Sequence, residues 1–262
     1  MLGKLMKYDL KKMYKVVIVF YIIAISLALV SRGTSELGKN IFAFKVLYIV
    51  FSSIEYAILA NVIIHSFVRI ILRFNTNFYK DESYLTHTLP VSKQKLLASK
   101  YLSALIVILT SVVVVFASLF IMFYSKQTIK FISDFLVGLS GGLNISVGGF
   151  VSLVVLVLFS QICSIISLTF FSIVLGNRAN EKKSLKSFIW VAIFYVASIL
   201  FTLFCVIIVC SIFGVVGEIF SNVISQKTIL IMFILAIILY LIYSILFYFL
   251  CKNMFKRGVN VD

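Results

Sequence analysis

The feature that most constrains this chain is a series of long stretches without a charged residue. One runs from residue 135 to residue 177, and another from residue 187 to residue 217. A helix needs about 20 apolar residues to cross the ~30 Å hydrocarbon core of a bilayer. Only 13% of the 262 residues are charged and 62% are hydrophobic, whereas soluble domains carry about 25% charged residues. The sequence therefore excludes a soluble fold and predicts an all-α integral membrane protein.

Six membrane spans are predicted, and together they form a single transmembrane domain over residues 1–262. Their approximate bounds are 13–31, 46–68, 101–124, 149–175, 188–213 and 228–250. The segment 138–149 holds five glycines, which predicts an outer loop rather than a seventh span. Gly214 and Gly217 indicate that the fifth span breaks there. A short re-entrant segment could follow this break.

The basic residues are distributed unevenly among the connections between these spans. Eighteen of the 24 Lys and Arg residues lie in 1–15, 69–100, 176–187 and 251–262. The remaining six lie in 32–45, 125–148 and 214–227. Because cytoplasmic loops carry an excess of Lys and Arg, we expect both termini to be cytoplasmic. This topology also explains the net charge of +15 without a nucleic-acid partner.

Residues 1–12 predict an amphipathic interfacial helix before the first span. Apolar side chains lie near one helical face and lysines surround that face. Such a helix would lie along the inner leaflet; the alternative is a basic tail that only follows the charge rule. No Ala-x-Ala-like cleavage site follows the first apolar run, so we interpret that run as a retained span rather than a signal peptide.

Motifs of autonomous catalysis do not occur in the sequence. It contains no G-x-x-x-x-G-K-[ST] phosphate loop, no H-E-x-x-H and no G-x-S-x-G. The two histidines and four cysteines do not show the spacing of metal ligands. We therefore expect no catalytic residues, no metal site and no cofactor on this chain.

One acidic residue, Glu55, lies near the middle of the second span. An acidic residue at that depth costs about 2.5–3.5 kcal/mol on insertion scales. At 100° per residue it shares a stripe with Ser52, Leu59, Val62 and Ser66. These five residues are candidates for a translocation path, and the alternative is a buried packing contact between helices. No Lys or Arg lies well inside a span, so we expect Glu55 to be protonated, hydrogen-bonded to Ser or Tyr, or paired across a subunit interface.

The longest predicted cytoplasmic connection, residues 69–100, contains the only proline and an acidic pair. Asp81 and Glu82 can begin a short helix, because negative charge suits its amino-terminal end. Pro90 ends that helix, since the residue before proline disfavours helical geometry. Ser92 can then cap the helix that enters the third span. A short helix without its own core needs a protein partner; the alternative is a solvated hairpin.

The run DESYLTHTLPV in this connection resembles the D-E-x-Y-L-T-x-T-L-P-V signature of bacterial ABC-2-type transporter permeases. The plan of the chain is also similar, with an amphipathic amino terminus, six spans and a structured inner loop after the second span. In that family the loop supplies a coupling helix that docks on a separate ATP-binding subunit. The resemblance implies an ATPase-coupling element made of Asp81, Glu82, Ser83, Tyr84, Leu85, Thr86, His87, Thr88 and Leu89.

The resemblance implies the permease subunit of an ATP-binding-cassette exporter in a bacterial plasma membrane. ATP and magnesium would bind the partner ATPase, and a second permease copy or a sister permease would complete the transporter. Because the spans carry few fixed charges, we expect an amphipathic or lipid-like substrate such as a peptide or drug. Two alternatives stay open. One is a membrane scaffold or immunity protein without transport activity, and the other is a secondary transporter, which predicts ionisable residues in several spans.

Overall fold

The computed structural model describes residues 2–80, 82–88, 91–179, 181–215, 217 and 225–256, without the side chains of 85–87 and 256. The helices group into two compact units, Met1–Lys130 and Phe131–Asp262. The sequence pattern alone does not divide the spans in this way. Each unit is built from long helices that pack along one another, and the two are described in turn.

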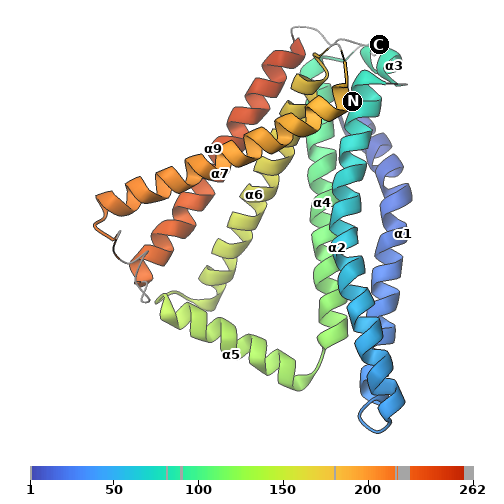
Figure 1. Ribbon diagram of the computed structural model, residues 1–262, viewed down its shortest axis with the longest axis vertical. Helices are drawn as coiled ribbons and strands as arrows, with labels where there is room; N and C mark the ends of the chain where they lie inside the picture. Colours follow the sequence, from blue (N-terminus) through green and yellow to red (C-terminus); the bar gives the residue numbers. More distant parts are fainter. Residues whose placement is uncertain are drawn as a thin grey trace. The chain divides into compact units, whose positions relative to one another are not determined.

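The first unit contains three long helices and one short one. The long helices are α1 (Leu2–Leu37), α2 (Phe42–Tyr79) and α4 (Lys93–Phe123), and the short one is α3 (Ser83–Thr88). Helix α1 packs against both α2 and α4, and α2 also contacts α3. Figure 1 shows the three long helices side by side, with α3 at the end where α2 finishes and α4 begins.

The core of the first unit is a seam of small and branched side chains between α1 and α2. Val17 and Ala24 of α1 are fully buried against Val62 of α2, and side chains of α4 pack on the same cluster. Small residues let helices approach closely in lipid. This seam holds the three helices together at the level of the cluster.

The second unit contains α6 (Val147–Gly176), α7 (Lys183–Ile212) and α9 (Gln226–Lys256). Helix α6 packs along α9 and α7, while α7 and α9 contact each other less. Rings of Phe171, Phe194 and Phe247 meet where the three helices converge, with centroids 5.2–5.7 Å apart. At one end, Gly176 of α6 lies so close to α7 that a Cβ would overlap Ser187. Glycine therefore sets the close approach of these two helices.

Six of the described helices are long and apolar enough to cross a membrane. They are α1, α2, α4, α6, α7 and α9, and each covers one of the six predicted spans to within one residue. The prediction of an all-α, multi-pass membrane protein is confirmed at this level. The sides on which the two termini lie stay predictions.

The break expected after the fifth span is present. Helix α7 ends at Ile212, and Gly214 follows with φ +70°, a left-handed conformation that glycine adopts without strain. The Val215 amide then donates to the Cys210 carbonyl at 2.9 Å, as at many glycine-capped helix ends. The re-entrant piece considered for this region falls largely on residues outside the described part of the chain.

The predicted separate interfacial helix at residues 1–12 is not found as such. Helix α1 runs without interruption from Leu2 to Leu37. Its buried face continues outward from Val17 through Met13 to Asp9, at intervals of four residues. The amino-terminal segment therefore packs on the unit along this face, which keeps it in line with the span instead of bending away.

The predicted outer loop at 138–149 is wrong for most of its length. Residues Lys126–Gly142 form helix α5, and α6 already begins at Val147, which leaves a short turn in which Asn144 has φ 53°. Each glycine in a helix costs about 1 kcal/mol relative to alanine, but apolar residues recur every three or four positions through Ile129, Ile132 and Leu139. This helical periodicity outweighs the glycine content.

Candidate functional site: a buried ionic cluster beside α3

Three long helices of the first unit meet at the carboxylate of Asp9, which is 1% exposed. Arg73 of α2 donates from Nε to Oδ1 at 3.0 Å. Lys100 of α4 donates from Nζ to Oδ1 and Oδ2 at 2.5 and 2.6 Å. The Asn77 amide reaches the same carboxylate at 3.4 Å. A charge removed from water must be paired and hydrogen-bonded, and the carboxylate of Asp9 meets both conditions.

The same arginine connects this cluster to the start of α3. Arg73 Nη1 donates to Oε2 of Glu82 at 2.8 Å, and Lys12 Nζ donates to Oε1. Glu82 directly precedes α3, and its amide also donates to the Thr76 carbonyl at 3.3 Å. The beginning of α3 is thus attached by side chains to α1 and by both side chain and backbone to α2.

Glu82 carries a full charge at neutral pH. Partial burial raises the pKa of its carboxyl, but hydrogen bonds from Lys12 and Arg73, together with their positive charges, more than offset this effect. The net result is a pKa below the ordinary value for glutamate. Both ion pairs that hold α3 are therefore formed over the physiological pH range.

Helix α3 has one attached and one exposed side. Ser83 is 5% exposed and faces the unit, whereas Tyr84 is 76% exposed. Thr88, at the end of α3, is also exposed. Among the other residues of the predicted coupling element, Asp81 and Leu89 lie outside the described residues, as do the side chains of Leu85, Thr86 and His87.

The predicted stripe around Glu55 lies entirely inside the first unit. Ser52, Glu55, Leu59, Val62 and Ser66 are all buried. Leu59 and Val62 belong to the apolar core. Ser66 shares a hydrogen bond of 2.7 Å with Ser111 of α4, which is also bonded to Tyr21 of α1 at 2.7 Å. The stripe thus supplies both apolar and hydroxyl contacts between the three helices.

Glu55 itself is completely buried, and neither carboxyl oxygen has a hydrogen-bond partner among the described residues. The hydroxyl of Ser31 in α1 is the polar group near it, although the two do not meet hydrogen-bond geometry. An ionised carboxylate without a partner is very costly in such surroundings. Glu55 is thus buried inside the first unit without a hydrogen-bond partner among the described residues.

The ionic cluster was not predicted from the sequence, because its members appear there as ordinary loop charges. Arg73 and Lys100 count among the basic residues that set the topology. Asp9 is the one acidic residue in the first 35 positions, and it lies four residues before Met13 on the buried face of α1. An isolated acid in register with an apolar stripe is the signal that could have identified it.

Comparison with known protein families, with curated proteins and with solved structures finds no match for this chain. Among the described residues, no group of three or more His, Cys, Asp and Glu side chains is placed to hold a metal ion.

Proposed function

We propose that this chain is the permease subunit of an ATP-driven exporter in a bacterial plasma membrane, and that α3 is its contact with a separate ATPase. The proposal rests on the two hydrogen bonds of Arg73. Its Nε donates to Asp9 in the cluster, and its Nη1 donates to Glu82 at the start of α3. A coupling element must be accessible to its partner and firmly joined to the spans. Helix α3 exposes Tyr84, and the residue directly before the helix, Glu82, is anchored to Arg73.

The connection provides a route for mechanical force. Helix α3 has six residues, too few for an isolated helix to be stable in water. Its position therefore depends on what it touches. A displacement of α3 acts on Arg73 through Glu82, and Arg73 shares the Asp9 carboxylate with Lys100. The ends of α1, α2 and α4 would respond together, which is how ATP binding on a partner could change the arrangement of the spans.

The charge distribution supports a cytoplasmic location for α3. An even number of spans keeps both termini on one side, and the loops that share that side carry 18 of the 24 basic residues. In this orientation, α3 faces the compartment in which ATP is available. The substrate class that suits a path with few fixed charges is amphipathic or lipid-like, and a second permease copy or a sister permease would complete the pathway.

The test is purification from the native host in a mild detergent. We expect a soluble P-loop ATPase in stoichiometric amount with the wild-type chain and much less with Tyr84→Ala. A matched control is Phe42→Ala, because Phe42 is 79% exposed and begins α2 at the opposite end of the same unit. Absence of an ATPase from the wild-type preparation, or equal recovery with both variants, would contradict the proposal.

The isolated carboxyl of Glu55 favours a second candidate, a proton-coupled secondary transporter. Acidic residues within spans form proton relays in pumps and transporters. In this case export would follow the pH gradient and continue without ATP, and Glu55→Gln would abolish it. If export requires ATP and Glu55→Gln transports normally, the second candidate is excluded and Glu55 acts in helix packing.

A further inference from the structure

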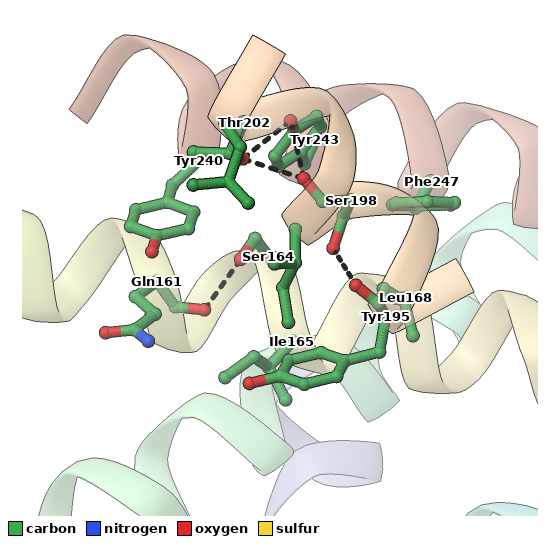
Figure 2. Close-up of a pocket in the computed structure, with 12 residues that line it drawn as sticks. Gln161, Ser164, Ile165, Leu168, Tyr195, Ser198, Thr202, Tyr240, Tyr243 and Phe247 are labelled. Carbon is green, nitrogen blue, oxygen red and sulfur yellow. Dashed lines mark hydrogen bonds between the residues drawn. The ribbon is translucent and has the colours of Figure 1, made fainter. Parts of the chain in front are cut away.

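The second unit has a partly open cavity of about 190 Å³ between α6, α7 and α9. Four of its lining residues come from α6, five from α7 and three from α9, and none of them is charged. Figure 2 shows that their side chains converge from the three helices on one space. The walls combine aliphatic and aromatic side chains with hydroxyl groups and one amide.

The cavity lies near the midpoints of three helices that are long and apolar enough to span a bilayer. Ser164, Ser198 and Tyr243 are each near the middle of a helix of 30 or 31 residues. A helix of that length exceeds the ~30 Å thickness of the core, so its midpoint is far from either surface. Water is scarce there, and polar groups need partners from the protein or from a bound molecule.

Polar groups on one side of the cavity are satisfied within the unit. The hydroxyls of Thr202 and Tyr243 lie 2.9 Å apart, and Tyr243 also donates to the Ser198 carbonyl at 3.2 Å. The Ser164 hydroxyl donates to the Gln161 carbonyl at 2.8 Å. Dashed lines in Figure 2 mark these bonds. The two bonds of Tyr243 link α9 to α7, and the bond of Ser164 lies within α6.

Polar groups on the other side are not satisfied in this way. Within the described part of the chain, the Gln161 amide and the phenol groups of Tyr195 and Tyr240 make no hydrogen bond. Figure 2 shows the polar ends of these three side chains on the same side of the cavity. Together they offer donors and acceptors to a molecule placed between them.

We propose that this cavity is a binding site for an uncharged, ring-sized molecule that carries a hydroxyl or carbonyl group. The polar group of the ligand would bond to Gln161, Tyr195 and Tyr240, and its apolar body would lie against Leu168 and Phe247. An apolar cavity of about 150 Å³ accommodates benzene, so the available space suits one ring. The absence of charged lining residues disfavours ions, because a charge would have no counter-charge there.

This site goes beyond the proposed function, because it needs only the second unit and no ATPase. If the cavity binds its ligand and no ATPase is recovered, the site stands while the exporter assignment fails. If an ATPase is recovered and the cavity stays empty, the reverse holds. The two proposals can therefore fail separately.

The only tryptophan of the chain provides a reporter for the test. Trp190 stacks on Phe194 with ring centroids 5.5 Å apart, and Phe194 contacts Phe247 at 5.7 Å. Phe247 lines the cavity. A nitroaromatic molecule bound in the cavity should therefore quench the fluorescence of Trp190.

The experiment is a titration of the full chain in lipid nanodiscs with 4-nitrobenzyl alcohol, and in parallel with 4-nitrotoluene, which lacks the hydroxyl. We expect saturable quenching by the alcohol and at least tenfold weaker saturation by 4-nitrotoluene. The double variant Gln161→Leu, Tyr240→Phe should weaken binding of the alcohol at least tenfold. Gln127→Leu, at an exposed position of α5, is the control and should bind as wild type does.

A second variant guards against misfolding as an explanation. Ser164→Phe should fill the cavity and abolish saturable quenching by both molecules, while circular dichroism shows an unchanged helix content. Linear quenching of the wild type would mean that the probe only partitions into the lipid, and would overturn the proposal. Equal binding by the double variant and by Gln127→Leu would overturn it as well.

Discussion

Replacement of Asp9 by asparagine is the sharpest perturbation of the ionic cluster, because it preserves shape and removes one charge. The Asp9 side chain is 2% exposed, and those of Arg73 and Lys100 are each 8% exposed. Asp9→Asn would leave two buried cations with Glu82 as their nearest negative charge. Loss of one partner from a buried pair costs about 3–5 kcal/mol. That is a large part of the roughly 5–15 kcal/mol by which a native domain is stable.

Two further variants test whether the cost arises from unbalanced charge. Lys12→Met removes a partner of Glu82 whose side chain is 40% exposed, and exposed pairs contribute about 0–1 kcal/mol. We therefore expect little change from this variant alone. The double variant Asp9→Asn, Lys100→Met removes one negative and one positive charge. It should recover part of the loss, and a double-mutant cycle measures how much.

The assay is unfolding in mixed micelles with increasing sodium dodecyl sulfate, followed by circular dichroism. Trypsin cleavage at Lys80 and Lys93, which flank α3, reports local attachment in the same samples. Asp134→Asn is the matched control, because Asp134 is an exposed aspartate in α5. If Asp9→Asn unfolds at the same detergent fraction as Asp134→Asn, the cluster does not stabilise the unit and the reasoning is refuted.

Three other predictions follow from the same structure. Arg73→Lys keeps the positive charge, but a lysine side chain cannot bond two carboxylates at once. Trypsin should therefore cleave beside α3 several times faster than in the wild type. The unfolding midpoint should change less than in Asp9→Asn. The pKa of Glu82 is lowered in the folded chain. Its contribution to the attachment of α3 is therefore complete above the ordinary glutamate pKa of about 4.3 and is lost as the pH falls through the folded pKa. Lys12→Met removes one cause of the lowered pKa, so α3 should lose its protection from trypsin at a higher pH than in the wild type. In thermal unfolding, Gly176→Ala should destabilise the second unit by about 1–3 kcal/mol, because the added Cβ overlaps α7. Gly148→Ala is the control and should have no such effect, because a Cβ there meets nothing within 4 Å.

The spans were predictable because a bilayer imposes a one-dimensional rule on the sequence. An apolar run of about 20 residues is sufficient to identify a span, whatever the rest of the chain does. The same rule gave no information on the ionic cluster, since Asp9 is separated by 64 residues from Arg73 and by 91 from Lys100. A count of loop charges treats all lysines and arginines alike, although these two are buried.

Local composition is misleading at α5 and at the start of α1. The glycines near the end of α5 suggested a loop, but each glycine in a helix costs only about 1 kcal/mol relative to alanine. The first positive φ in this region is at Asn144, beyond α5. At the amino terminus, the lysines suggested an interfacial helix, whereas the structure buries Asp9 of α1 against α2 and α4.

The ionic character of the cluster is more informative about its role than its effect on the stability of the unit. Replacement of a buried ion pair by apolar residues is often neutral or stabilising, so stability alone does not explain why charges occupy this position. Helix α3 is too short to bring an apolar face of its own. An ion pair can hold such a segment through a single residue, Glu82, and the fork of Arg73 fixes its direction. The cluster is thus better suited to attach a small exposed element to three long helices than to increase the stability of the helices themselves.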